Sequence, residues 1–329
     1  MKFGAVPLAR AEGAILAHSA HLTGGPIRKG QVLTADDVAR MAAEGWADVI
    51  VAQLAPDDVG EDAAATRLGR ALWTPGLDVT KAFTGRVNLK ARGPGIVALD
   101  AGAIHALNRV HPAITLATLP PFARVVAGTL VGTVKIIAYG VPEAALGVAE
   151  GWATRAISVL PVVCATAGLL LTEVPGQDAK LTVKGKRVIE ARLRALGIAL
   201  VAVEVTAHDT GAMAAALARM QGDILLILTG SATSDLQDVA PRAVCAAGGT
   251  VARFGMPVDP GNLLFLGAMG ARPVIGLPGC ARSPALNGAD WVLERLACGL
   301  AVTDDDIAQM GVGGLLKEIS IRPQLRDPD

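Results

Sequence analysis

One short segment constrains the fold of this chain more than any other: residues 223–241, with the sequence DILLILTGSATSDLQDVAP. Its apolar run, residues 224–228, is typical of a strand buried on both faces, as in a parallel sheet. The small residues Thr229, Gly230 and Ser231 follow at once, and their backbone can approach a ligand closely. Asp238 comes next, just before a helix that we expect to begin at Pro241. Because ligands of open α/β sheets bind outside the carboxyl ends of strands, the segment predicts a binding loop, with an ordinary strand-to-helix connection as the alternative.

Length and composition favour two globular domains and exclude one class of partner. The chain has 329 residues, of which 52% are hydrophobic and 18% charged, and this is ample for a sizeable core. Thirty basic residues balance thirty acidic ones, and aromatic residues make up only 3%. Nucleic-acid surfaces need a basic face or stacking rings, so we expect no nucleic-acid partner.

The cysteines and the apolar segments indicate a cytoplasmic location without a membrane partner. Cys164, Cys245, Cys280 and Cys298 form no CxxC pair and no zinc spacing, which fits a reducing compartment. The N-terminus lacks the continuous apolar region of a signal peptide. The apolar run 156–171 is interrupted by proline and glycine, so we interpret it as a buried strand and loop.

Two patterns of elements divide the chain. Residues 1–150 read as a mixed α+β module, in which Thr34 and Asp37 form a capping box before a helix and residues 48–53 form a strand. Residues 151–302 alternate strand and helix, which predicts an α/β domain with a three-layer, mostly parallel sheet. We expect its first strand at residues 159–165 and a helix at 56–72 in the preceding module. Residues 303–329 read as a loosely held C-terminal extension.

Four segments of the second domain carry residues suited to binding an oxyanion, and a doubly wound sheet would bring them together. Glycine and small hydroxyl residues let backbone N–H groups surround an anion, and neighbouring carboxylates can hold Mg²⁺. The segments are GLLLTEV with Glu173, the turn at 229–231 with Ser234, Asp235 and Asp238, the turn MPVDPGN with Pro260, Gly261 and Asn262, and the loop GLPGCARSP with Gly276, Pro278, Gly279 and Ser283.

Each candidate has a structural alternative. Asp238 can cap the following helix, Glu173 can be a solvated turn residue, and Ser283 can be an N-cap. Among the five histidines, His208 lies at the carboxyl end of a predicted strand and is the one we expect near the ligand. The chain contains no Walker loop, no GxGxxG and no GxSxG motif.

Taken in order, these segments resemble the molybdopterin-binding domain shared by molybdopterin molybdotransferases and molybdopterin adenylyltransferases. That family has a T-G-G turn with an Asp nine positions after the Thr, where this chain has Thr229, Gly230, Ser231 and Asp238. Its T-G-D-E-L, K-P-G-K-P and G-L-P-G-N-P-x-S segments correspond to GLLLTEV, VDPGN and GLPGCARS, and the resemblance spans residues 159–299. The wider pattern, with MPVDPGNLL and MGVGGLLKEI, is most similar to the molybdopterin-binding module often fused to a molybdenum-cofactor cytidylyltransferase.

The resemblance implies a set of roles. The pterin phosphate would lie on the amides of residues 229–231 and 276–280, and Asp238 and Glu173 would be the catalytic residues, holding Mg²⁺ or orienting the dithiolene and the incoming molybdate or nucleotide. Relatives form dimers or trimers, so a homo-oligomer is expected. The cofactor-binding residues predicted in this way are Thr229, Gly230, Ser231, Ser234, Asp235, Pro260, Gly261, Asn262, Gly276, Pro278, Gly279 and Ser283.

The chain also departs from the family pattern, and three functional hypotheses stay open. Asp259 and Asn262 stand where K-P-G-K-P has lysines, and Ser231 replaces the second glycine of T-G-G. The first hypothesis is a molybdopterin-binding transferase of molybdenum cofactor biosynthesis. The second is a non-catalytic carrier that hands molybdopterin to a separate cytidylyltransferase or an apo-molybdoenzyme. The third is a nucleotide pyrophosphatase of the competence/damage-inducible family.

Overall fold

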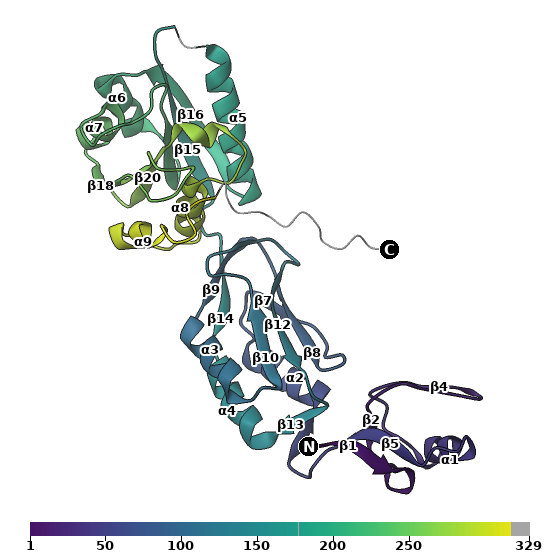
Figure 1. Ribbon diagram of the computed structural model, residues 1–329. Helices are drawn as coiled ribbons and strands as arrows, with labels where there is room; N and C mark the ends of the chain where they lie inside the picture. Colours follow the sequence, from purple (N-terminus) through teal and green to yellow (C-terminus); the bar gives the residue numbers. More distant parts are fainter. Residues whose placement is uncertain (177, 317–329) are drawn as a thin grey trace. The chain divides into compact units, whose positions relative to one another are not determined.

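The computed structural model describes residues 1–176 and 178–316. The chain divides into two compact units, one formed by residues 1–93 and 97–160 and the other by residues 94–96 and those from 161 onwards (Figure 1). The fold is mixed α/β, with one six-stranded, mostly parallel sheet and several small antiparallel sheets. Within the described residues no helix is both long and apolar enough to cross a membrane.

The six-stranded sheet forms the centre of the second unit and has the order β16-β15-β17-β20-β19-β18. The first four of these strands run parallel, β19 is antiparallel to β20, and β18 is antiparallel to β19. The strands are β15 (Thr166–Glu173), β16 (Ala199–Ala207), β17 (Ile224–Leu228), β18 (Thr250–Phe254), β19 (Phe265–Met269) and β20 (Arg272–Leu277).

Helices cover both faces of this sheet, which makes the unit three-layered (Figure 1). Leu169 and Leu171 of β15 pack with helices α5 (Ala179–Ala195) and α8 (Gly288–Ala297), and Leu170 packs with α6 (Thr210–Arg219) and α7 (Val239–Ala246) on the other face. All five residues of β17 have no exposed surface. Burial of each such side chain stabilises the fold by roughly 1.5–3 kcal/mol, which explains why this strand is a continuous apolar run.

Small sheets, four α-helices and one 3-10 helix make up the first unit, around two apolar cores. The sheets have the orders β1-β5-β2, β10-β12-β8-β7, β11-β9-β14, β13-β6 and β3-β4. The strands are β1 (Lys2–Pro7), β2 (Ile15–Leu16), β3 (Ala20–Leu22), β4 (Gly25–Ile27), β5 (Asp48–Gln53), β6 (Asp58–Gly60), β7 (Leu77–Val79), β8 (Arg86–Ala91), β9 (Gly95–Leu99), β10 (Ile114–Thr118), β11 (Arg124–Val125), β12 (Leu130–Ile136), β13 (Gly140–Pro142) and β14 (Ile157–Pro161). The helices are η1 (Leu8–Arg10), α1 (Ala35–Ala43), α2 (Glu61–Ala71), α3 (Ala101–Val110) and α4 (Glu143–Ala153), of which η1 is a 3-10 helix.

The local signals at the start of α1 are confirmed. The hydroxyl of Thr34 accepts the backbone N–H of Asp37, and the Asp37 carboxylate accepts the backbone N–H of Thr34. The predicted strand 48–53 matches β5 residue for residue. Both predictions depend only on neighbouring residues, so no distant contact had to be known.

Several predicted boundaries are wrong, and each error has a physical cause. GLLLTEV does not follow the first strand of the sheet but forms most of β15, because helices cover both faces of this run. Helix α7 begins at Val239, two residues before Pro241, since proline is tolerated in the first turn of a helix. Helix α2 begins at Glu61, five residues after Pro56, because residues 58–60 pair with β13.

The segment after residue 302 is better held than the sequence indicates. Residues Asp304–Gln309 form helix α9, which Thr303 and Asp306 cap reciprocally. Ile307 and Met310 belong to the core that α5 and α8 share with the sheet. The rest of the predicted extension, residues 317–329, lies outside the described residues.

Gly276 lies inside β20, one residue before the strand ends, and not in the loop that follows. It pairs with Phe265 of β19, and a β-carbon on Gly276 would lie 1.9 Å from an atom of the Phe265 ring. Phe265 is fully buried. Glycine is therefore required at this position by core packing.

We predict that Gly276→Ala loosens the six-stranded sheet. The added methyl group overpacks the core, which costs about 3 kcal/mol. Hydrogen exchange measured by mass spectrometry should show faster exchange of β17 and β20 amides and unchanged exchange in β12 of the other unit. Gly147→Ala on α4 is the control, since no atom lies within 4 Å of its new methyl group. Unchanged protection of β17 in Gly276→Ala would contradict this account of the packing.

Candidate functional site

The strand order reverses between β15 and β17, which is where ligands bind in open α/β sheets. β16 lies on one side of β15, and β17 lies on the other. The carboxyl ends of β15, β17 and β20 carry three of the predicted segments, at residues 172–173, 229–231 and 279–282. We call these residues the switch-point edge. A parallel sheet brings them to one edge although they are far apart in the sequence.

The Thr172 hydroxyl joins three strand ends at this edge. Its oxygen accepts the backbone N–H of Gly230 at 2.9 Å and lies 2.9 Å from Nδ1 of His208, which follows β16. The Gly230 N–H can only donate, so the Thr172 proton is free to bond Nδ1 of a neutral His208 whose proton is on Nε2. Thr172 is fully buried, so loss of either bond would leave a buried polar group unpaired.

Arg282 joins two of the predicted anion-binding segments. It ends the 3-10 helix η2 (Gly279–Arg282), and its Nη2 donates to the carbonyl oxygen of Thr229 at 2.6 Å. The Nε atom of Arg282 is buried and has no hydrogen-bond partner among the residues that the structure describes. Burial also lowers the pKa of Arg282 from its ordinary value, because a charge is costly away from water. Arg282 is not among the site residues predicted from the sequence, where it appears only as the single cation in GLPGCARSP.

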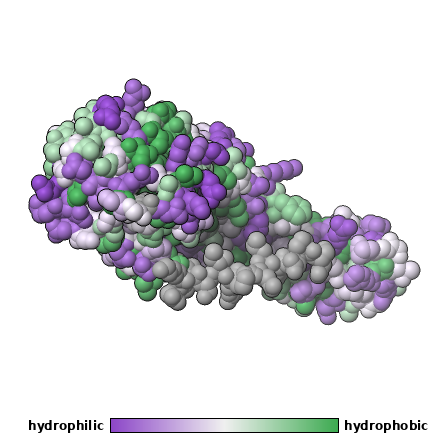
Figure 2. Space-filling view, turned by 90° about the horizontal axis from the view of Figure 1, so that it is seen from above, coloured by the Kyte–Doolittle hydropathy of each residue, from purple (hydrophilic) through white to green (hydrophobic). Residues whose placement is uncertain are grey.

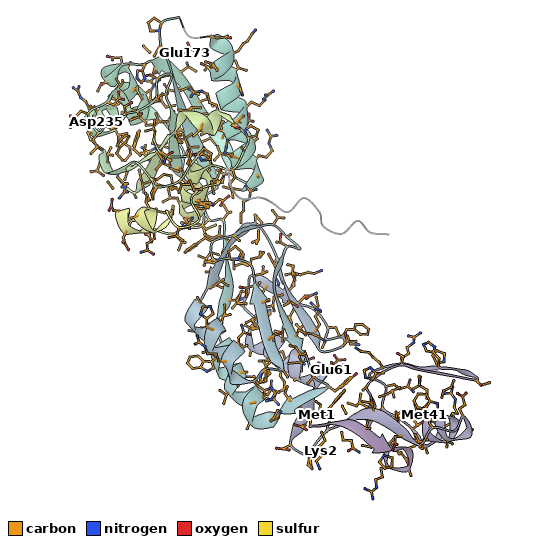
Figure 3. The ribbon with its side chains drawn as sticks, in the orientation of Figure 1. Met1, Lys2, Met41, Glu61, Glu173 and Asp235 are labelled. Carbon is orange, nitrogen blue, oxygen red and sulfur yellow. The ribbon has the colours of Figure 1, made fainter. Side chains whose placement is uncertain are left out.

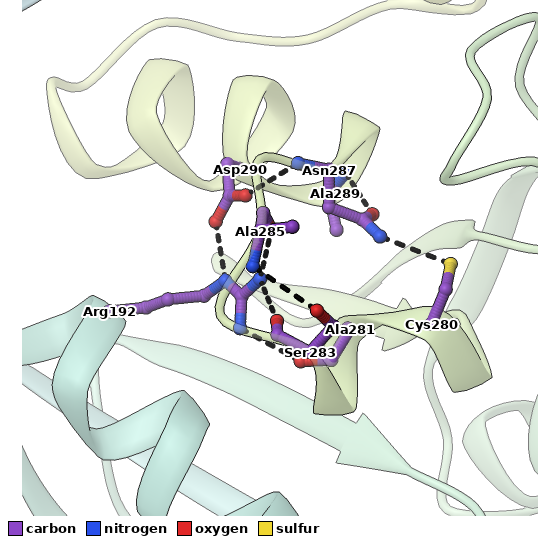
Figure 4. A network of polar contacts seen from close by, with 8 residues as sticks. All are labelled: Arg192, Cys280, Ala281, Ser283, Ala285, Asn287, Ala289 and Asp290. Carbon is purple, nitrogen blue, oxygen red and sulfur yellow. Dashed lines mark hydrogen bonds and ion pairs between the residues drawn. The ribbon is translucent and has the colours of Figure 1, made fainter. Parts of the chain in front are cut away.

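A second arginine, Arg192 of α5, holds the same loop in place (Figure 4). Its Nε lies 2.6 Å from a carboxylate oxygen of Asp290, and both side chains are about one-tenth exposed. Its remaining nitrogens donate to the carbonyl oxygens of Ala281, Ser283 and Ala285 at 2.7–3.0 Å. A planar guanidinium can satisfy four acceptors at once, so Arg192 fixes the backbone that follows η2.

The start of α8 completes this network (Figure 4). Asn287 and Asp290 form a capping box, in which the Asp290 carboxylate accepts the Asn287 N–H at 2.8 Å. The Asn287 side-chain amide donates to Sγ of Cys280 at 3.0 Å. Asn287 is 1% exposed and Cys280 is exposed, so a buried donor fixes an exposed thiol.

Asp238 is the N-cap of α7, as the structural alternative stated. One of its carboxylate oxygens accepts the N–H of Val239 at 2.7 Å, and the other accepts the N–H of Ser234 at 2.9 Å. Asp235 accepts the N–H of Gln237 in the same connection. Asp238 therefore shapes the segment between the β17 turn and α7, whatever further role its oxygens have.

Glu173 ends β15, and its carboxylate accepts the hydroxyl of Thr182 from α5 at 2.8 Å. Figure 3 shows Glu173 and Asp235 at separate places on the periphery of the unit. Glu173 and Asp238 share no hydrogen-bond partner, and the described residues hold no group of three or more His, Cys, Asp or Glu able to bind a metal ion. The Mg²⁺ role of these two carboxylates thus stays a prediction.

The fourth predicted segment is bound to a different neighbour. Pro260 accepts the N–H of Gly288 at the start of α8, and Asn262 donates to the carbonyl of Met256 at 3.4 Å. A β-carbon on Gly261 would lie 3.0 Å from the backbone of Gly288. Within residues 178–316, no hydrogen bond joins this turn to residues 229–231.

The remaining predicted residues of the last loop have structural partners. Pro278 is buried and precedes η2, and Gly279 is exposed at its start. The Ser283 hydroxyl accepts the N–H of Ala285 at 3.3 Å, and its carbonyl accepts Arg192. Of these three predicted residues, Gly279 belongs to the switch-point edge.

Comparison with known proteins gives limited information. Residues 5–53 match the model of a family described as "Domain of unknown function (DUF8806)". No curated protein matches the chain. Among solved structures, the molybdopterin biosynthesis MoeA protein from Pyrococcus horikosii is similar, with 14% identity and a TM-score of 0.31, over 91% of this chain and 76% of that one. The chain thus has a distant structural similarity to that protein, too distant to support a functional argument.

We predict that Thr172→Val frees the turn after β17. Valine has nearly the same shape but leaves the Gly230 N–H and His208 Nδ1 without their partner, at a cost of about 1–3 kcal/mol. Hydrogen exchange resolved at the Gly230 amide should become about ten-fold faster or more, since 1.4 kcal/mol corresponds to a factor of ten. Thr172→Ser keeps the hydroxyl and should retain the protection. Equal exchange in all three proteins would show that the hydroxyl does not hold the turn.

We also predict that Asp290→Asn destabilises the second unit. Asparagine keeps the shape and the capping acceptor but leaves the Arg192 charge uncompensated, which lowers the free energy of unfolding by about 3 kcal/mol. Urea-dependent hydrogen exchange of α8 measures this loss. Asp78→Asn is the matched control, because its ion pair with Arg92 is at least half exposed and contributes less than about 1 kcal/mol. Similar effects of the two substitutions would refute the bracing role of Arg192.

Proposed function

We propose that this chain is a molybdopterin-binding protein of molybdenum cofactor biosynthesis, and that the pterin phosphate binds at the switch-point edge. The observation that carries the proposal is the hydrogen bond from Arg282 to the Thr229 carbonyl. It joins the two segments whose motifs resemble the phosphate-binding loops of the family. The ligand's anionic group would thus meet both loops at the place where the strand order reverses.

Backbone N–H groups without a partner favour the binding of an anion at this edge. The N–H groups of Ser231, Gly279 and Cys280 make no hydrogen bond within the described residues. The N–H of Gly230 is already bound to Thr172, and Gly276 lies within β20, so the proposal relies on the other amides of the two segments. Three unpaired donors and one guanidinium are suited to the oxygens of a phosphate group.

The catalytic part of the proposal concerns Glu173 and Asp238. Glu173 ends β15 at the switch-point edge, and Asp238 lies in the connection that follows the β17 turn. Carboxylates beside a bound phosphate can hold Mg²⁺. The protein would then act mainly by positioning the pterin and stabilising the transferring oxyanion. The group transferred would be molybdate or a nucleotide.

A binding experiment tests the proposal. Gly230→Asp places a carboxylate at the turn, and its repulsion of the phosphate should weaken binding of molybdopterin, followed by intrinsic fluorescence, about 100-fold or more. Asp238→Ala should weaken it less, about ten-fold, by releasing the Ser234 amide and loosening the connection to α7. Asp100→Ala is the control, because Asp100 caps α3 of the other unit in the same way. Binding that is indifferent to both site substitutions would rule out this location.

A second candidate function, a non-catalytic carrier of molybdopterin, is favoured by the turn at residues 256–262, where Asp259 and Asn262 stand in place of the two lysines of the K-P-G-K-P pattern. Asp259 donates its N–H to the Gly314 carbonyl and accepts the N–H of Leu316, so this turn is fastened to the segment after α9. Turnover distinguishes the two candidates: molybdate insertion with Mg²⁺ and nucleotide-activated pterin supports the enzyme. Binding without turnover supports the carrier, whose partner would be a cytidylyltransferase or an apo-molybdoenzyme. Hydrolysis of ADP-ribose would instead support the pyrophosphatase alternative.

A further inference from the structure

Arg282 combines a fixed position with an uncompensated charge. Its Cγ passes Gly185 of α5, where a β-carbon would lie 3.8 Å away, and its Nη2 is held by the Thr229 carbonyl. The side chain therefore reaches from η2 across to the end of β17. A flexible surface arginine has no such fixed geometry.

The charge on Arg282 has no counter-ion within the described residues. No carboxylate pairs with it there, its Nε is buried without a partner, and Nη1 makes no hydrogen bond. A carbonyl oxygen neutralises only part of a positive charge, and arginine stays protonated in proteins. The fold thus carries an electrostatic cost that nothing in the described chain offsets.

Arg192 shows what a purely structural arginine looks like in the same region. It contacts the same loop, yet it has a carboxylate partner in Asp290 and three backbone carbonyls (Figure 4). Its polar groups are therefore used within the protein. Arg282 differs because one edge of its guanidinium is left without an acceptor.

The free Nη1 of Arg282 lies beside the open part of the site. A β-carbon on Gly279 would be 3.7 Å from Nη1, and Gly279 is exposed. The unpaired amides of Ser231, Gly279 and Cys280 belong to the same edge.

We propose that Arg282 is the specificity-determining residue of the switch-point edge, where its guanidinium receives the phosphate monoester of the ligand and selects phosphorylated over unphosphorylated pterins. The pterin part of this inference rests on the proposed function, whereas the binding of a phosphate group by Arg282 does not. The missing counter-ion of Arg282 is then supplied by the ligand. Figure 2 shows hydrophilic and hydrophobic residues mixed over one face of the molecule.

The test compares molybdopterin with its dephosphorylated form on the wild type, Arg282→Met and Arg282→Lys. A charge-assisted hydrogen bond corresponds to about 10–100-fold in affinity, so Arg282→Met should lose that factor for molybdopterin and change dephosphorylated binding less than about three-fold. Arg282→Lys should recover part of the preference, because the charge is kept. Equal weakening of both ligands would identify a structural brace instead, and unchanged preference would also overturn the inference.

A second arm separates this inference from the proposed function and does not need a stable variant. Phenylglyoxal modifies accessible arginines of the wild-type protein, and mass spectrometry reports each site. Inorganic phosphate should slow modification of Arg282 and leave that of Arg92, an exposed arginine of the other unit, unchanged. If phosphate protects Arg282 from phenylglyoxal but the protein binds no pterin, Arg282 keeps its role as a phosphate-binding residue and the pterin assignment is rejected. No protection by phosphate and no phosphate preference among the pterins would reject the role of Arg282.

Discussion

Burial of the parallel sheet on both faces is the constraint on which the rest of the structure depends. Leu170 packs toward one helical layer, and Leu169 and Leu171 pack toward the other, so no side chain in the middle of β15 can be polar without cost. Polar residues first appear where the strands end. Thr172, Thr229 and their neighbours therefore gather at one edge, and this is a consequence of burial as much as of function.

Most polar groups at and around this edge bond to one another within the chain. Thr172 accepts the Gly230 N–H, and Asp238 accepts the Ser234 N–H. Arg192 donates to three carbonyl oxygens of the loop after β20. Most of the polar groups in these segments thus form hydrogen bonds that hold the loops in place. What remains for a ligand is small and well defined: a few backbone donors and the unpaired side of Arg282.

The sequence predicted those elements that depend on near neighbours. The α1 capping box and the strand 48–53 were correct, and the apolar run 224–228 is the central strand β17. Predictions failed where a distant contact decides. Only the Phe265 ring, eleven residues earlier in the chain, shows that Gly276 occupies a core position. Arg282 was overlooked because nothing in a sequence reveals which arginine lacks a carboxylate.

By itself, the sequence determined the α/β alternation of the second unit, its doubly covered sheet, and the order of the small-residue loops that follow its strands. Hydrophobic pattern and turn residues act locally, so these features can be read from the chain. Only the tertiary structure decided which loops meet. It joined residues 229–231 to Arg282, bound residues 256–262 to α8 and the segment after α9, and left the Arg282 guanidinium without a carboxylate partner among the described residues. Strand order and side-chain pairing set those distances, and both arise from contacts between residues far apart in the chain.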